Sequence, residues 1–319
     1  MIGRVVTSLP SPSDGTIDIG PLSIHAYGLM IALGVIAGVR LLGRRMVAKG
    51  VGTAEDASSI AVWGVVGGVI GSRLYHVATD WSKFSNNLGA IPQIWKGGLG
   101  IPGGLLVGVA AGIIAVRKRN LQISAVLGCA APAIPLAQAI GRCGNWFNQE
   151  LFGRPTTLPW GLRIDAQHRP AEYANSPTFH PTFLYESLAN VLLCVMLIVL
   201  DRRKSIRPGN LFALYLGGYG AIRFFVEGMR IDEAHKVGGL RWNQWVALAA
   251  VLGAAAYLVV KRNQLQPATT AALANDEPAN DEPANDEPAN DAPVNDAPAN
   301  ESPSPDLATA LQEPRELPD

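Results

Sequence analysis

The most informative segment of the sequence reads Ala139-Ile-Gly-Arg-Cys-Gly-Asn-Trp-Phe-Asn-Gln-Glu-Leu-Phe-Gly153. It follows an apolar run, Ile123–Ile140, that is long enough to cross a bilayer, and it places Arg142 where that run leaves the hydrocarbon. A charged arginine is costly in lipid, so its presence predicts a polar cavity or a bound anion. In a continuing helix, Arg142, Asn145 and Gln149 would share one face. We therefore predict that this segment handles phosphate in an active site.

The composition indicates a membrane protein with a solvated extension. Hydrophobic residues make up 48% of the 319 residues, and charged residues only 16%. The net charge is zero, but 13 of the 26 acidic residues and only one of the 26 basic residues lie from Asn263 onward. The body before that point suits a membrane protein that touches anionic lipid. Residues 263–319 repeat Asn-Asp-Glu-Pro-Ala without an apolar period, which predicts a disordered acidic tail with no catalytic part.

Seven apolar stretches are long enough to span about 30 Å of hydrocarbon. They predict an all-α integral membrane protein, with an N-terminal segment at residues 1–20 and a seven-span catalytic domain at residues 21–262. The start of the chain has no cleavable signal pattern, so the first span would direct insertion. The predicted spans are Leu22–Gly43, Ala57–Val77, Leu99–Val116, Ile123–Ile140, Thr182–Leu200, Asn210–Glu227 and Trp242–Val260.

Positive charges set the predicted orientation. Alternate connections are dense in lysine and arginine: Arg44, Arg45 and Lys49; Arg117, Lys118 and Arg119; Arg202, Arg203, Lys204 and Arg207; Lys261 and Arg262. The positive-inside rule makes these connections cytoplasmic, so the N-terminus lies outside and the C-terminus in the cytoplasm. The proline-rich residues 142–181 then form a small extracytoplasmic cap. The segment around Arg142 lies at the outer leaflet.

A second group of polar residues falls at the same depth in the sixth span. Tyr219, Arg223, Glu227 and Arg230 form one stripe near its outer end. An internal Arg223–Glu227 ion pair is one explanation. Three arginines at one depth, with Arg142, are better explained by an anion that they share, and their planar donors suit phosphate.

Three other polar residues lie near the outer ends of the predicted spans, and two of them have two interpretations. Glu186 needs a partner in lipid, and an inward-facing arginine is the natural one. Tyr27 is either an interfacial belt residue or a cavity residue. Arg73 either pairs with Asp80 or lines the site.

The three cysteines, Cys129, Cys143 and Cys194, are best explained as small buried residues. A nucleophilic role for Cys143 is the alternative, because it lies inside the segment around Arg142. No spacing typical of a metal site is present, so no metal is expected.

These motifs resemble the signature of the bacterial prolipoprotein diacylglyceryl transferase family. The matching segments, in order between about residues 20 and 250, are His25–Leu29, Gly71–Tyr75, Gly141–Gly153, His180–Glu186 and Tyr219–Arg230. The resemblance implies a multi-pass enzyme of the bacterial cytoplasmic (inner) membrane that needs no cofactor. Its implied reaction, the first step of lipoprotein maturation, moves the sn-1,2-diacylglyceryl group of phosphatidylglycerol to the lipobox cysteine thiol of a prolipoprotein. A thioether forms and glycerol phosphate is released.

The resemblance also implies a set of site residues. Arg142 and Arg223 are the expected essential arginines around the lipid headgroup. The catalytic candidates are Arg142, Arg223, Glu150 and Tyr27. The substrate-binding candidates, beside the two arginines, are Asn145, Asn148, Gly153, Tyr219, Glu227, Arg230 and Arg73.

One departure leaves the general base open. Many family members carry a histidine in the glycine-rich segment where this chain has Pro102. Glu150, His25 or a phosphate oxygen remain as candidates. A transporter or flippase for an anionic solute is an alternative function, but it predicts internal repeats that the sequence does not show. A lipid-binding scaffold is a second alternative, and it would not need so many polar side chains.

Overall fold

The computed structural model describes residues 8–19, 22–94, 97–204 and 206–261. The predicted tail, residues 263–319, lies outside the described residues. Six helices are long and apolar enough to cross a membrane, which confirms an all-α integral membrane fold. They are α1 (Ala26–Ala48), α2 (Ala54–Thr79), α4 (Ile101–Lys118), α5 (Ile123–Arg142) with its short continuation α6 (Gly144–Phe147), α7 (Thr182–Lys204) and α9 (Trp242–Val260).

The sixth predicted span, Asn210–Glu227, corresponds to α8 (Pro208–Met229), which has 22 residues. At about 1.5 Å per residue such a helix reaches about 33 Å, enough to cross the hydrocarbon core. It is not one of these six helices, and it buries the polar side chains of Asn210, Tyr215 and Glu227. The count of seven spans therefore stays a prediction.

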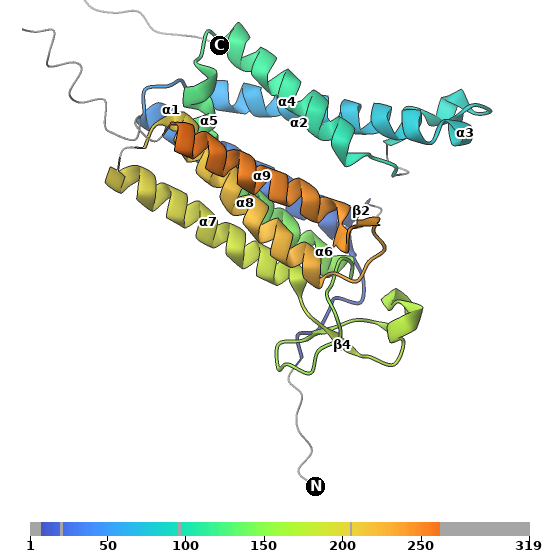
Figure 1. Ribbon diagram of the computed structural model, residues 1–319. Helices are drawn as coiled ribbons and strands as arrows, with labels where there is room; N and C mark the ends of the chain where they lie inside the picture. Colours follow the sequence, from blue (N-terminus) through green and yellow to red (C-terminus); the bar gives the residue numbers. More distant parts are fainter. Residues whose placement is uncertain (1–7, 20–21, 95–96, 205, 262–319) are drawn as a thin grey trace, which may run out of the picture. The chain divides into compact units, whose positions relative to one another are not determined.

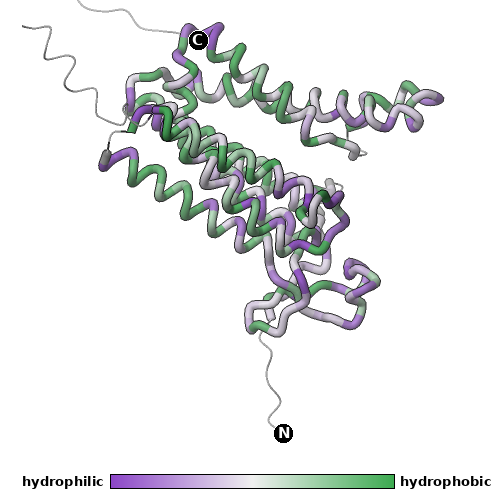
Figure 2. The backbone as a smooth tube through the Cα atoms, viewed as in Figure 1, coloured by the Kyte–Doolittle hydropathy of each residue, from purple (hydrophilic) through white to green (hydrophobic). Residues whose placement is uncertain are grey.

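The helices form two groups. In the larger group, α5 packs against α1, α7 and α8, and α9 packs along α8 (Figure 1). In the smaller group, α2 and α4 pack closely together, and a Cβ atom on either Gly71 or Gly103 would collide with the carbonyl oxygen of the other. The pair joins the larger group mainly through α1. Figure 2 shows hydrophobic residues along the helices and hydrophilic residues gathered at their ends.

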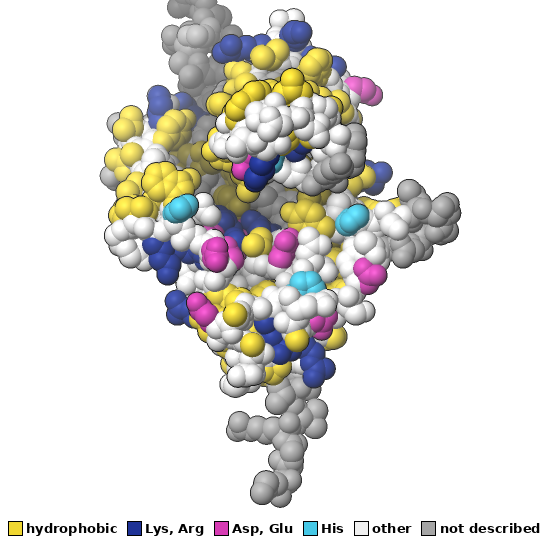
Figure 3. Space-filling view, turned by 90° about the vertical axis from the view of Figure 1, so that its right-hand side faces the viewer, with side chains coloured by type: hydrophobic (Ala, Val, Ile, Leu, Met, Phe, Trp, Pro, Cys, Tyr) yellow, Lys and Arg dark blue, Asp and Glu magenta, His cyan; other side chains and the backbone are white. Residues whose placement is uncertain are grey.

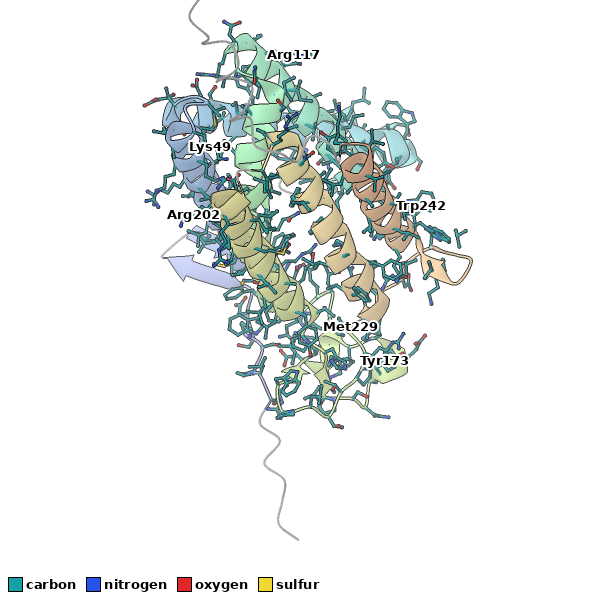
Figure 4. All side chains as sticks on the ribbon, turned by 60° about the vertical axis from the view of Figure 1, so that its left-hand side comes forward. Lys49, Arg117, Tyr173, Arg202, Met229 and Trp242 are labelled. Atoms are coloured by element: carbon teal, nitrogen blue, oxygen red, sulfur yellow. The ribbon has the colours of Figure 1, made fainter. Side chains whose placement is uncertain are left out.

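One end of the bundle carries the basic connections. Lys49, Arg117 and Arg202 lie at that end, away from Met229 and Tyr173 (Figure 4). Arg45 and Lys49 at the end of α1 both bind the buried carboxylate of Asp201 in α7, at 2.7 and 2.8 Å. These ion pairs fasten α1 to α7 at the basic end.

The other end carries a small folded segment between α6 and α7. Two short strands, β3 (Leu162–Arg163) and β4 (Thr178–Phe179), pair antiparallel, with the 3₁₀ turns η3 (Ala166–His168) and η4 (Ala171–Tyr173) between them. Buried aromatic and aliphatic side chains give this segment its own core: Phe152, Leu162, Ile164 and Phe179. We call residues 148–181 the cap.

Short strands and turns complete the same end. The strand β1 (Thr16–Ile19) pairs with β2 (Leu22–His25), so the first helix begins at Ala26 and the prediction that it begins at Leu22 is wrong. The short helix α3 (Trp81–Phe84) and the turn η1 (Leu88–Ala90) follow α2. The hairpin of β5 (Lys236–Val237) and β6 (Leu240–Arg241) joins α8 to α9.

Candidate active site

Arginines and carboxylates from three helices meet at the end of the bundle next to the cap. Arg142 is the last residue of α5, Glu186 lies in the first turns of α7, and Arg223 lies near the end of α8. The carboxylate of Glu186 is buried. Its Oε1 lies 3.0 Å from Nε of Arg142, and its Oε2 lies 3.2 Å from Nη1 of Arg223. The prediction that Glu186 has an inward-facing arginine partner is confirmed, and it has two.

Glu227 forms a second junction one turn further along α8. Its side chain is fully buried, and its Oε2 lies 2.5 Å from Nη2 of Arg223 and 3.4 Å from Nη1 of Arg230. Its Oε1 lies 3.2 Å from Nε of Arg241 and accepts a hydrogen bond of 3.2 Å from Asn243. The Arg223–Glu227 pair weighed from the sequence is therefore present, within a larger assembly.

Asp232 completes this assembly beyond the end of α8. Its carboxylate accepts hydrogen bonds from Nε and Nη2 of Arg230, at 2.7 and 2.8 Å, and from Nη2 of Arg241, at 2.8 Å. Partial burial opposes its ionisation, but the hydrogen bonds and charges of the two arginines outweigh burial and hold the pKa of the Asp232 carboxyl below its usual 3.8. Neither Asp232 nor Arg241 was predicted as a site residue.

We call these seven residues the arginine–carboxylate network: Arg142, Arg223, Arg230, Arg241, Glu186, Glu227 and Asp232. Four guanidinium groups face three carboxylates, so one positive charge is left over. The arginine side chains of Arg142 and Arg223 are 24% and 16% exposed, whereas those of Arg230 and Arg241 are 9% and 6% exposed. The first two are the more exposed pair, and the last two join the end of α8 to the start of α9.

The surface of this end is hollowed. Figure 3 faces it and shows lysine or arginine side chains inside a hollow in the middle of the face, with acidic side chains nearby. A small cavity reaches the network itself and is lined by Arg142, Asn145, Glu186 and Arg230. The cavity is only about 10 Å³, so it holds no more than about one water-sized group next to the network.

The segment around Arg142 does not continue as one helix. The helix α5 ends at Arg142, and both Gln149 and Leu151 adopt positive φ, at 50° and 57°. Gln149 points to the cap, where its Nε2 donates to Oδ2 of Asp165 at 2.7 Å. The prediction that Gln149 shares a face with Arg142 is wrong, because a left-handed backbone turns the chain away.

The backbone turn instead gathers three other polar side chains. Nη1 of Arg142 donates to Oδ1 of Asn145 at 3.4 Å. The amides of Asn145 and Asn148 donate to Oε1 of Glu150 at 2.8 and 3.2 Å. Glu150 is therefore linked to Arg142 through Asn145, and its carboxylate is held in place by two amides.

Two tyrosines border Arg142. The ring of Tyr27, in the first turn of α1, lies so close to Gly144 that a Cβ atom there would be 2.6 Å from its Cδ2. Tyr219 stacks on Tyr215, with ring centroids 6.0 Å apart. Both Tyr27 and Tyr219 act electrostatically on Arg142. Tyr27 therefore lies against the polar cluster, which favours a cavity residue over a belt residue.

Gly153 joins the cap to the end of α8. Its backbone forms an antiparallel bridge with Arg230. A Cβ atom on Gly153 would lie 2.9 Å from Cβ of His180 and 3.1 Å from the carbonyl oxygen of Met229. The structure gives this glycine a packing role, because no larger residue fits between the two segments.

Arg73 has a different environment from the one expected. It is 7% exposed and donates to the carbonyl oxygens of Ala90, Ile91 and Gly97 at 2.7 Å each. The Arg73–Asp80 pair weighed from the sequence is wrong, since Asp80 binds His76 and Lys83 instead. Arg73 holds the loop before α4 and takes no part in the arginine–carboxylate network.

The cysteines and possible metal ligands add nothing to this site. Cys129 and Cys194 are buried, as predicted, and the Cys143 thiol donates to the carbonyl oxygen of Ala139 in its own helix. Across the ranges that the structure describes, no three histidine, cysteine, aspartate or glutamate side chains are grouped as metal ligands.

Known proteins resemble the chain over its whole membrane body. The family model described as "Prolipoprotein diacylglyceryl transferase" matches residues 15–260. Phosphatidylglycerol–prolipoprotein diacylglyceryl transferase 2 of Streptomyces coelicolor is 46% identical over 259 residues, which are 80% of this chain and 81% of that protein. Phosphatidylglycerol–prolipoprotein diacylglyceryl transferase of Cutibacterium acnes is 46% identical, over 79% of this chain and 86% of that protein. The enzyme of that name in Mycobacteroides abscessus is 42% identical, over 82% of this chain and 81% of that protein.

Proposed function

The chain belongs to the prolipoprotein diacylglyceryl transferase family, and from this we propose that the arginine–carboxylate network binds the phosphate of phosphatidylglycerol during the reaction. The chain is a transferase of lipoprotein maturation, and its reaction moves a diacylglyceryl group from phosphatidylglycerol to a prolipoprotein. In this proposal the acceptor is the cysteine thiol of the lipobox. The lipid headgroup lies at the cap end of the bundle.

The observation that carries this assignment is the unbalanced charge of the network. A phosphodiester has one negative charge, which equals the one positive charge that three carboxylates leave on four arginines. Arg142 and Arg223 share Glu186 and are the two more exposed arginines, so they are the residues that contact the phosphate. Their planar N–H groups suit two phosphate oxygens.

The same two arginines favour the transition state over the bound lipid. The thiol sulfur attacks the glyceryl carbon, the carbon–oxygen bond to phosphate breaks, and its electron pair stays on the phosphate oxygen. The leaving glycerol phosphate therefore gains negative charge as the bond breaks. Arg142 and Arg223 interact more strongly with the leaving group than with the diester, which is the condition for catalysis.

The remaining polar residues position Arg142 in this proposal. Asn145 contacts Arg142 directly, and Glu150 orients Asn145 and Asn148. Tyr27 and Tyr219 lie near Arg142 and border the phosphate site in this proposal. Glu227 and Arg230 keep the end of α8 in position, so Arg223 points at Glu186.

The membrane topology follows from the charges at the two ends. The end with Lys49, Arg117 and Arg202 faces the cytoplasm by the positive-inside rule (Figure 4). In this topology α8 is the sixth of seven spans, the N-terminus and the cap are extracytoplasmic, and the tail is cytoplasmic. The membrane is the bacterial inner membrane, where prolipoprotein signal sequences emerge.

A reconstituted reaction tests the proposal. Purified protein in phosphatidylglycerol vesicles, supplied with a lipobox peptide, should release glycerol phosphate and yield a diacylglyceryl peptide. A peptide with serine in place of the cysteine is the control and should give neither product. Glycerol phosphate release that does not depend on the peptide cysteine would contradict the proposal, and solute movement without any new thioether would favour a transporter.

Truncation after Gln264 is expected to leave transfer by the purified protein within about twofold of the full chain, a change no larger than that of surface substitutions (about 0.5 kcal/mol). The reason is that the acidic repeat has no apolar period with which to pack against the membrane body. Initial rates of both proteins at equal concentration provide the measurement. A loss of tenfold or more would refute the view that the tail has no catalytic part.

A further inference from the structure

The thiol end of the reaction needs a group that takes the thiol proton. A cysteine thiol ionises near pH 8.5 in water, so a base nearby increases the thiolate that attacks. Glu150 is a poor candidate, because both of its amide partners bind one carboxylate oxygen and link it to Arg142 at the phosphate end. His25 is exposed at the start of α1, and no carboxylate among the described residues lies within ion-pair distance of it, although Asp14 is near enough to interact with its charge.

His76, in the last turn of α2, has the arrangement of an oriented base. Its Nδ1 lies 3.1 Å from Oδ2 of Asp80, which caps the same helix. The ammonium group of Lys83 lies 2.8 Å from Oδ1 of Asp80 and is the main cause that holds the pKa of that carboxyl below its usual value. An ionised Asp80 accepts the Nδ1 proton, and Nε2 then carries the free electron pair. Among the described histidines, only His76 has a carboxylate within ion-pair distance of a ring nitrogen.

The loop before α4 packs against the Nε2–Cδ2 edge of the His76 ring at Gly98, a residue with no side chain to extend over that edge. Gly98 has a φ of +75°, and a Cβ atom built on it would collide with Nε2 of His76. Arg73 fixes this loop through its hydrogen bonds to the carbonyl oxygens of Gly97 and Gly98, at 2.7 and 3.0 Å. The side chain of His76 is 22% exposed, so a substrate atom can reach the ring.

His76 also lies at the end of the bundle that the reaction uses. The helices α2 and α5 both pack against α1, and both run antiparallel to it. The last turn of α2, with His76, and the last turn of α5, with Arg142, therefore lie at the same end. Helix α2 belongs to the smaller helix group and Arg142 to the larger one.

We propose that His76, oriented by Asp80, is the general base that accepts the thiol proton of the prolipoprotein cysteine. This assignment rests on the proposed function. Nε2 takes the proton, the thiolate forms the bond to the glyceryl carbon, and the carbon–oxygen bond breaks with its electrons moving to the phosphate. The proton then passes from His76 to the leaving glycerol phosphate or to water, so the base is restored. Asp80 is a positioning residue, because it acts through His76.

The simplest competing explanation is structural. The ring of His76 packs edge-on against Phe84, with centroids 5.7 Å apart, so its removal could merely loosen the turn after α2. A test must therefore separate the loss of a base from the loss of a packing contact. A peptide with selenocysteine in place of cysteine does so, because a selenol is more acidic than a thiol and is ionised without a base.

The experiment compares His76→Gln with the wild-type full chain in phosphatidylglycerol vesicles, with both peptides. Transfer to the cysteine peptide should fall on the order of 10²- to 10⁴-fold, the usual contribution of a general base. Transfer to the selenocysteine peptide should stay close to the wild-type rate. Asp80→Asn should show the same difference between the two peptides with a smaller loss. His168→Gln, an exposed histidine of the cap, is the matched control and should change neither rate.

Each outcome decides the assignment. An equal loss with both peptides would show a structural role and overturn it, and so would an unchanged rate with the cysteine peptide. Failure of the wild-type chain to modify either peptide would overturn the proposed function and the base together. If the wild type modified the peptides and His76→Gln modified the cysteine peptide at the same rate, only the assignment of His76 as the base would be overturned.

Discussion

Replacing Arg142 by alanine is expected to lower diacylglyceryl transfer on the order of 10²- to 10³-fold, as does the loss of one donor to a developing anion in other enzymes. Arg142 and Arg223 share the carboxylate of Glu186 and are the two more exposed arginines of the network. Without either one, the leaving phosphate loses a cation as its charge grows. Arg223→Ala should therefore have an effect of the same size, measured as initial rates of glycerol phosphate release.

Two further variants make this result specific. Arg142→Lys keeps the charge without the planar donors, so it should recover only part of the activity. Arg163→Ala removes an exposed arginine from the cap and should leave the rate unchanged. Both alanine variants should still insert and elute as folded protein. Near-normal transfer by either purified variant would remove these arginines from the phosphate site.

Replacing Glu227 by glutamine is expected to destabilise the protein by about 3–5 kcal/mol, the usual effect of removing one partner of a buried ion pair. Glu227 is fully buried and meets Arg223, Arg230 and Arg241 within 3.4 Å. The amide has nearly the same shape but no charge, so the surplus on the network rises from one positive charge to two. Thermal unfolding in detergent should show a clear drop in Tm.

Glu172→Gln is the matched control for this experiment. Glu172 is exposed in the cap, so the same chemical change there should alter Tm little. If Glu227→Gln unfolded at the same temperature as the control, the network would not hold the end of α8 to the start of α9.

Most of the helical fold could be predicted from the sequence, because lipid requires long uninterrupted apolar runs. The predicted span Trp242–Val260 has the same ends as α9, and the predicted Leu99–Val116 differs from α4 by two residues at each end. The first span was less accurate at its start. Leu22–His25 is apolar enough to resemble helix, but it pairs with β1, and strand pairing depends on a partner that hydropathy does not reveal.

The site was predicted in part for a related reason. Helical spacing on α8 correctly brought Arg223 and Glu227 together, because both lie within one regular element. Spacing failed at Gln149, where a left-handed residue ends the regular geometry. It failed again at Arg241, whose partners Glu227 and Asp232 lie on the far side of the β5–β6 hairpin. The only signal for Arg241 was an arginine placed directly before an apolar run.

The tight contact between α2 and α4 has a mechanical consequence. Because the backbones meet at Gly71 and Gly103, a residue with a side chain at either position would force the two helices apart. The pair is thus one closely packed unit that joins the larger group mainly through α1. His76 lies on this unit and Arg142 on the larger group, so the proposed base for the thiol and the proposed site for the phosphate are carried by separate groups of helices.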